Sequence, residues 1–147
     1  MKIKINVDCH FEDMEVIINC REISRELEAV IASLHAMEQK LTGMKDGQIY
    51  FLEAAEVLYI EAVDKKIFLY TKNDIYETTL KLYELEEVLS AGSFFRAGKS
   101  SIINFDWIRS VKSDLDGRLI VTMGNGEKLV VSRQYASYVK DKLRRCR

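Results

Sequence analysis

The chain has 147 residues, of which 48% are hydrophobic and 31% are charged, and its formal net charge is -1. This length suits one domain with a small appendage, and the apolar content suffices for a buried core, which argues against intrinsic disorder. No stretch approaches the roughly 20 apolar residues that a membrane-spanning helix needs, so we expect a cytoplasmic protein without membrane insertion. Three cysteines without a CxxC pair are typical of free thiols in a reducing compartment.

Residues 1–45 are predicted to form a small ββα unit. Polar and apolar residues alternate from Lys2 to Val7, and Glu15 to Asn19 is a second β-like run, so the two could form a hairpin. A helix over about residues 21–38 follows, because apolar residues recur there at spacings of three and four. These residues are Ile23, Leu27, Val30, Ile31 and Leu34. Residues 42–47, TGMKDG, contain breakers and are interpreted as a linker.

From residue 48 onward the pattern is persistently β. Short runs rich in β-branched and aromatic residues alternate with polar turns, and a short helix is expected over about residues 82–89. Asp116-Gly117 and Asn125-Gly126 are typical of two-residue hairpin turns, in which both central residues need a positive φ. Ser132 is a candidate N-cap for a final helix over about residues 133–143. The predicted fold class is therefore mainly β with α (α+β), with residues 46–147 as the second unit.

The residue types give little sign of catalysis. Two histidines, His10 and His35, lack a convincing partner, and no GxxxxGK[ST] or GxGxxG phosphate-binding loop occurs. Cys9, His10 and Cys20 would be awkward zinc ligands, because two are adjacent and a fourth is missing. We therefore expect no enzyme, no metal or other cofactor, and no small-molecule substrate.

Charge is unevenly distributed along the chain. Residues 96–147 contain 12 Lys or Arg and 5 Asp or Glu, a balance of +7, whereas residues 1–95 have a balance of -8. Such asymmetry indicates an anionic partner for the C-terminal part. The charge alone is equally compatible with two solvated faces of one domain.

The densest basic signal is the segment FFRAGKSSIIN, residues 94–104. Its arginine and lysine suit phosphate oxygens, and its hydroxyls and the backbone N–H groups beside glycine can also donate to phosphate. Arg133 would begin the last helix, where the positive end of the helix dipole attracts anions, or it could read guanine with both guanidinium donors. The alternative is that Arg96 and Arg133 pair with the acidic half of the protein.

Two motifs of the LytTR family resemble parts of this sequence. Its FxRxHRSxxVN motif is matched, in the same order, by Phe94, Arg96, Ser100, Ile102, Asn104 and Ile108. Its downstream VSRxY motif is matched by Val131, Ser132, Arg133 and Tyr135. Residues 57–62 and 82–86 are similar to the family's upstream strand and helix. The resemblance covers about residues 48–145. It implies a bacterial, response-regulator-like transcription factor with an elongated β domain, whose loops enter successive major grooves of double-stranded DNA.

The resemblance implies three contact regions: the turn at residues 64–66, the paired positions 98 and 99, and the arginine that opens the last helix. The candidate DNA-binding residues are Lys65, Lys66, Arg96, Gly98, Lys99, Ser100, Ser101, Asn104, Ser132 and Arg133. Gly98 replaces the family's frequent histidine. Lys99 is therefore expected to shift the balance from base readout towards phosphate attraction, and the preferred DNA sequence cannot be borrowed from relatives.

About 47 residues precede the resembling region, too few for the phosphoacceptor receiver domain that many relatives carry. We expect the helix of this N-terminal unit to pack on the β domain or on a second protomer, and a homodimer on repeated half-sites, since linked sites multiply affinity. Two other interpretations stay open. The basic face could dock an acidic protein partner, or Phe94, Phe95 and Trp107 could stack the bases of single-stranded RNA.

Overall fold

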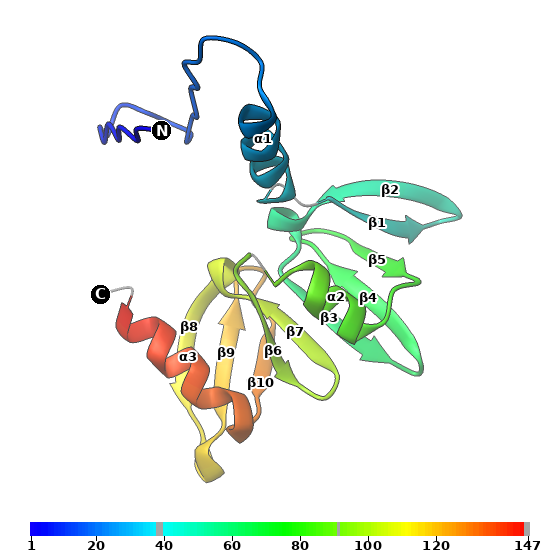
Figure 1. Cartoon of the computed structure of the whole chain (residues 1–147). Helices are drawn as coiled ribbons and strands as arrows, with labels where there is room; N and C mark the ends of the chain where they lie inside the picture. Colours follow the sequence, from blue (N-terminus) through cyan, green and yellow to red (C-terminus); the bar gives the residue numbers. More distant parts are fainter. Residues whose placement is uncertain (38–39, 91, 146–147) are drawn as a thin grey trace.

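The computed structural model describes residues 1–37, 40–90 and 92–145, and within them two antiparallel sheets and three α-helices form the fold (Figure 1). The strands of the larger sheet are β1 (Lys40–Lys45), β2 (Gln48–Glu53), β3 (Tyr59–Val63), β4 (Lys66–Tyr70), β5 (Ile75–Thr78), β6 (Phe94–Gly98) and β7 (Ser101–Asn104). Those of the smaller sheet are β8 (Ile108–Ser113), β9 (Leu119–Met123) and β10 (Lys128–Val131). The helices are α1 (Arg25–Met37), α2 (Leu82–Val88) and α3 (Arg133–Arg145).

The larger sheet has the order β2-β1-β5-β4-β3-β7-β6, and the smaller sheet has the order β10-β9-β8. The predicted α+β fold, with many short strands, a short middle helix and a C-terminal helix, is confirmed. None of the described helices is long and apolar enough to cross a membrane.

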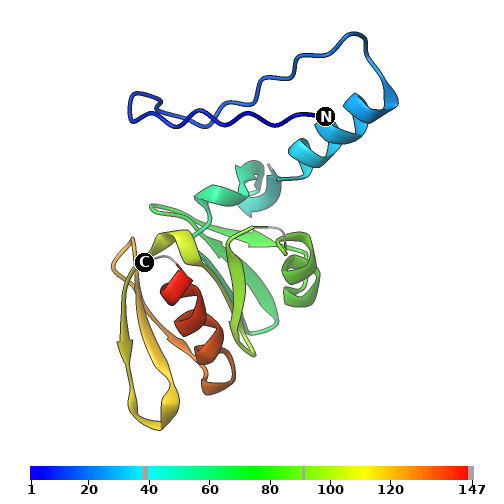
Figure 2. The ribbon, with the colours of Figure 1, turned by 60° about the vertical axis from the view of Figure 1, so that its left-hand side comes forward.

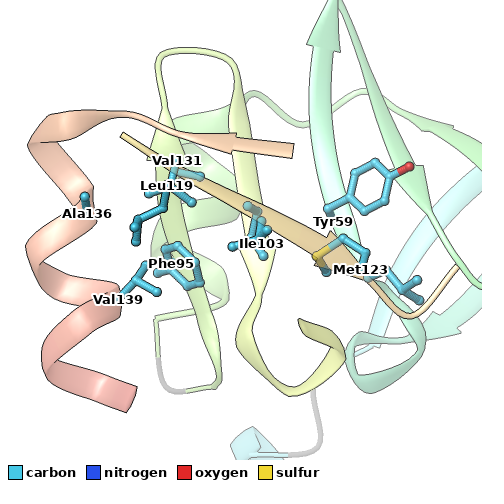
Figure 3. Packing of buried hydrophobic residues seen from close by; sticks show 11 residues of the cluster. Tyr59, Phe95, Ile103, Leu119, Met123, Val131, Ala136 and Val139 are labelled. Carbon is cyan, nitrogen blue, oxygen red and sulfur yellow. The ribbon is translucent and has the colours of Figure 1, made fainter. Parts of the chain in front are cut away.

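Successive side chains of the central strands point to opposite faces of the larger sheet, and both faces are covered by other elements. On one face, Tyr59 and Ile103 pack towards the smaller sheet and α3 (Figure 3). On the other, Ile60 and Ile102 pack towards α2. The first cluster comprises Leu58, Tyr59, Phe95, Ala97, Ile103, Leu119, Val121, Met123, Val131, Ala136 and Val139. The second comprises Leu41, Leu52, Val57, Ile60, Leu69, Tyr76, Leu82, Leu85, Leu89 and Ile102.

These cores also engage the aromatic side chains that could have stacked bases. Phe95 is buried, and Phe94 packs against the second cluster. Trp107 is half-buried in the first cluster, and its ring N–H donates to the carbonyl oxygen of Ala55 at 2.7 Å. Because packing holds all three rings, the structure argues against the single-stranded RNA interpretation.

The turns differ in part from the expectation. Residues 42–47 are wrongly predicted as a linker: they complete β1 and its turn, where Asp46 and Gly47 both have positive φ. Asp116 and Gly117 also both have positive φ, as predicted. In the β9–β10 turn only Gly126 does, so the hairpin is present but its turn is not the predicted type.

The two strands predicted over residues 2–7 and 15–19 are wrong, because the structure has no helix or strand before α1. All residues from 1 to 23 are exposed, and a two-stranded hairpin with nothing on its apolar face is only marginally stable in water. The helix begins later than predicted, after Ser24, whose hydroxyl accepts the N–H of Leu27 at 3.2 Å. Its predicted end, residue 38, lies outside the described residues.

Candidate nucleic-acid interface

The β6–β7 turn is built around Arg96. Its Nε donates to the carbonyl oxygen of Gly98 and its Nη2 to that of Lys99, both at 2.7 Å, and its Nη1 pairs with the carboxylate of Glu86 at 3.0 Å. Only 19% of this side chain is exposed. Arg96 therefore uses guanidinium N–H donors to shape the turn. It also pairs with the acidic half of the protein, which is the alternative to DNA contact that the sequence left open for this residue. The turn presents Lys99 and Ser100 to solvent.

The β3–β4 turn lies beside the β6–β7 turn, because the N–H of Ala62 donates to the carbonyl oxygen of Ser100 at 2.8 Å. Asp64 and Lys65 form this turn with φ of 50° and 67°. Left-handed backbone costs a non-glycine residue about 1–2 kcal/mol. The turn exposes Lys65 and Lys66 next to the β6–β7 turn.

Helix α3 starts against β6. The N–H of Ser132 donates to the carbonyl oxygen of Ala97 at 2.8 Å, and the carbonyl oxygen of Ser132 accepts the N–H groups of Tyr135 and Ala136, each at 3.0 Å. Ser132 thus stands at the N-cap position, as predicted. Its buried hydroxyl, however, has no hydrogen-bond partner within the described chain, so the side-chain cap is missing.

An open depression of about 480 Å³ lies between the β6–β7 turn and the start of α3. It is lined by Arg96, Lys99, Ser132, Arg133, Gln134 and Tyr135. Four predicted site residues therefore meet there, and the sequence reasoning missed the last two as lining residues. Exposed cationic side chains around a helix N-terminus suit an anionic group such as a backbone phosphate.

Asn104 has to be removed from the predicted contact set. It lies at the other end of β7 from the turn, is 2% exposed, and donates from Nδ2 to the carbonyl oxygen of Val57 at 3.0 Å. Its Oδ1 accepts the N–H of Asp106 at 3.1 Å. A buried amide whose two ends are both hydrogen-bonded joins strands and has no surface to offer to DNA.

A further element, the β8–β9 turn, touches the side chain of Arg133. A Cβ placed on Gly117 would lie 3.1 Å from both Cγ and Cδ of Arg133. The turn is closed by the N–H of Asp114, which donates to the carbonyl oxygen of Arg118 at 2.9 Å. The Asp-Gly dipeptide could be read as a turn from the sequence, but its contact with Arg133 depends on how the smaller sheet packs against α3.

The interpretation of Cys9, His10 and Cys20 as metal ligands gains no support. Ligand atoms of Asp8, Cys9 and His10 lie within 4.8 Å of one another, all three residues are exposed, and Cys20 is not among them. Asp8 accepts the backbone N–H of His10 at 2.9 Å, and this hydrogen bond lowers the pKa of the Asp8 carboxyl. These contacts are those of a local turn and do not by themselves indicate a metal site.

The larger sheet also carries a partly buried carboxyl, that of Glu61 in β3. Burial raises its pKa, and the hydroxyl of Tyr70, which donates to it, offsets part of that effect. The ring of Tyr70 stacks on that of Tyr59 with centroids 4.5 Å apart. Ionised Glu61 is therefore less favourable in the folded protein than in water.

Comparison with known proteins agrees with this geometry. The family model of the LytTr DNA-binding domain matches residues 47–144. A solved LytTr DNA-binding domain from Bacillus cereus, part of a methyl-accepting/DNA response regulator, superposes with a TM-score of 0.67 and 29% identity, covering 72% of this chain and 97% of that one.

Two Staphylococcus aureus proteins described as uncharacterized HTH-type transcriptional regulators match over 145 residues, or 97% of this chain and 98% of theirs. The protein of strain NCTC 8325 is 22% identical and that of strain MRSA252 is 21% identical. This likeness includes the N-terminal segment that the family model leaves out. In the described part of the present chain, no two α-helices follow one another directly, which a helix-turn-helix would require.

The family model spans about two thirds of the chain, and the architecture agrees with the solved domain. The motif residues frame turns that are exposed and basic. This chain therefore belongs to the LytTR family of DNA-binding domains.

Proposed function

We propose that this protein is a sequence-specific transcription regulator that inserts its turns into major grooves of double-stranded DNA. One observation carries the proposal. The β3–β4 turn, the β6–β7 turn and the start of α3 lie along one end of the molecule, at the bottom of Figure 1, although they are far apart in the sequence. They expose Lys65, Lys66, Lys99 and Arg133, of which Lys99 and Arg133 line the depression.

The exposed cations have different proposed roles. Arg133 projects from the start of α3 and is exposed, so its guanidinium can form the two parallel hydrogen bonds that distinguish guanine. Lys99 and the hydroxyls of Ser100 and Ser101 are proposed to hold backbone phosphates. Arg96 is proposed to act mainly through the turn that it shapes, because three of its five N–H donors are engaged with Gly98, Lys99 and Glu86.

A homodimer on repeated half-sites is part of the proposal, acting on DNA in the bacterial cytoplasm. One module of this size offers a limited contact area, and linking two modules raises the overall affinity without new contacts. The direction of regulation, activation or repression, depends on where the site lies relative to a promoter.

The test is fluorescence anisotropy of the full chain on labelled duplexes across a salt series, preceded by selection from a random duplex library. We expect an enriched sequence that binds more tightly than scrambled duplex, with log affinity falling against log salt by about 0.9 per phosphate contact. Selection without enrichment would refute sequence specificity. Weak, equal binding to every duplex would favour a basic face that docks an acidic protein.

A further inference from the structure

The N-terminal segment, residues 1–37, carries many exposed apolar side chains. Among the side chains described there, eleven large hydrophobic ones are exposed, including Ile5 at 79% and Val16 at 55%. The two β-like runs of this segment keep their alternation but form no ladder. An apolar surface of this extent is uncommon on a protein that acts alone.

A tight turn nevertheless lies between the two runs. The N–H of Phe11 donates to the carbonyl oxygen of Asp8 at 3.2 Å, and the Asp8 carboxylate accepts the N–H of His10 at 2.9 Å, so the chain reverses here. Figure 2 shows an extended stretch on either side of this turn, and the two diverge as they leave it. A hairpin of the two runs would need a surface against its apolar face, because a two-stranded ribbon alone is only marginally stable in water.

Helix α1 does not pack the segment onto the β domain, so the β domain does not supply the missing surface. Leu27, Val30 and Leu34 are only half-buried, and Ile31 is 39% exposed. Figures 1 and 2 both show α1 and the extended segment standing away from the two sheets. Of the two packing partners predicted for this helix, the β domain is therefore disfavoured.

We infer that residues 1–37 form the dimerisation unit: the hairpin of residues 2–7 and 15–19, together with α1, folds against the same unit of a second copy. Each exposed apolar side chain can bury about 60–120 Å², so burial of all eleven would remove at most roughly 700–1,300 Å², against about 800 Å² per partner in a stable interface.

The charge and position of the segment favour a protein partner over DNA. Residues 1–37 contain four Lys or Arg and seven Asp or Glu, a net charge of -3, which repels phosphates. The segment lies at the end of the molecule opposite to the basic turns (Figure 1), so a dimer formed there leaves both DNA-binding surfaces accessible. The inference rests on the homodimer of the proposed function and specifies its interface.

The test uses the full chain, with sedimentation velocity and amide hydrogen exchange over a concentration series. We expect a monomer–dimer equilibrium, with exchange in residues 2–7 and 15–19 slowing as the dimer forms and exchange in β3 staying constant. Ile5→Lys and Val16→Lys should each give monomers. Tyr83→Lys is the matched control, because Tyr83 is 64% exposed on α2, outside the segment.

Ile5→Lys should leave the affinity for a single half-site unchanged and lower the affinity for paired half-sites by about 10²-fold or more. A chain that remains monomeric at every concentration would overturn the inference, and so would a dimer that both variants leave intact. A dimer without sequence preference would instead refute the proposed function alone, and specific half-site binding by a monomer would refute only the dimer interface.

Discussion

Replacing Gly117 with alanine should weaken DNA discrimination, although Gly117 itself is not proposed to touch DNA. The new Cβ would stand 3.1 Å from Cγ and from Cδ of Arg133, whereas carbon atoms pack best at about 3.5–4.0 Å. The stem of Arg133 must therefore shift by a few tenths of an ångström. Its guanidinium, farther from the backbone, shifts by more.

The size of the effect follows from what Arg133 is proposed to do. A bidentate contact with guanine contributes about 1–3 kcal/mol to discrimination. It depends on donor–acceptor distances of about 2.7–3.2 Å, so a displaced guanidinium loses part of it. We expect Gly117→Ala to cost about 1 kcal/mol, or about fivefold, in the affinity ratio between selected and scrambled duplex.

A matched control separates this effect from backbone strain. Gly117 has a φ of 79°, which by itself penalises alanine by about 1–2 kcal/mol of folding free energy. Gly126 has a φ of 89°, but a Cβ there would meet nothing within 4 Å. Gly126→Ala should lower the melting temperature by about as much as Gly117→Ala does, and it should leave the affinity ratio between selected and scrambled duplex unchanged.

The decisive assay is competition anisotropy on Gly117→Ala, Gly126→Ala, Arg133→Ala and the double variant of Gly117 and Arg133. In the Arg133→Ala background, Gly117→Ala should have no further effect on the ratio, because the side chain that it displaces is gone. An unchanged ratio in Gly117→Ala, or an equal loss in Gly126→Ala, would refute the positioning of Arg133 by this turn.

Three further predictions concern single side chains. Arg133→Ala should lose about 1–3 kcal/mol of discrimination, measured as the same affinity ratio; equal losses on both duplexes would mean that Arg133 contacts phosphate only. Lys99→Ala should weaken binding to both duplexes similarly and reduce the salt slope by about 0.9, and an unchanged slope would count against a phosphate contact. Because burial raises the pKa of Glu61, its ionisation opposes folding once the pH exceeds the ordinary carboxyl range, and Glu61→Gln should raise the melting temperature at neutral pH but much less in acid. Equal gains at both pH values would contradict this.

Much of the β domain could be predicted because its determinants are local. Alternation identified the strands, and Asp116-Gly117 marked a turn by its backbone requirement alone. The same requirement is met at Asp46-Gly47, but the breakers in residues 42–47 favour the interpretation as a linker. In the structure, burial nevertheless alternates along β1, because the rest of the fold covers one face of this strand.

The sequence predicts which residues gather at the candidate site better than it predicts what each of them does. Arg96 and Asn104 belong to the motif, yet one shapes a turn and the other joins two strands. A motif marks residues that the fold needs as well as residues that a ligand needs, and only burial and hydrogen bonding separate the two. Lys99 and Arg133 are exposed, which is why we propose them for the second group.

The N-terminal segment shows the complementary limit. Its β-like alternation is real, but alternation specifies which face must be covered and not what covers it. Within one chain, the apolar faces of residues 2–7 and 15–19 meet no partner surface, and the hydrogen-bonded ladder does not form. If a second copy supplies the missing face, dimerisation and the folding of this segment become one equilibrium. Its strands would then be present only at concentrations that support the dimer.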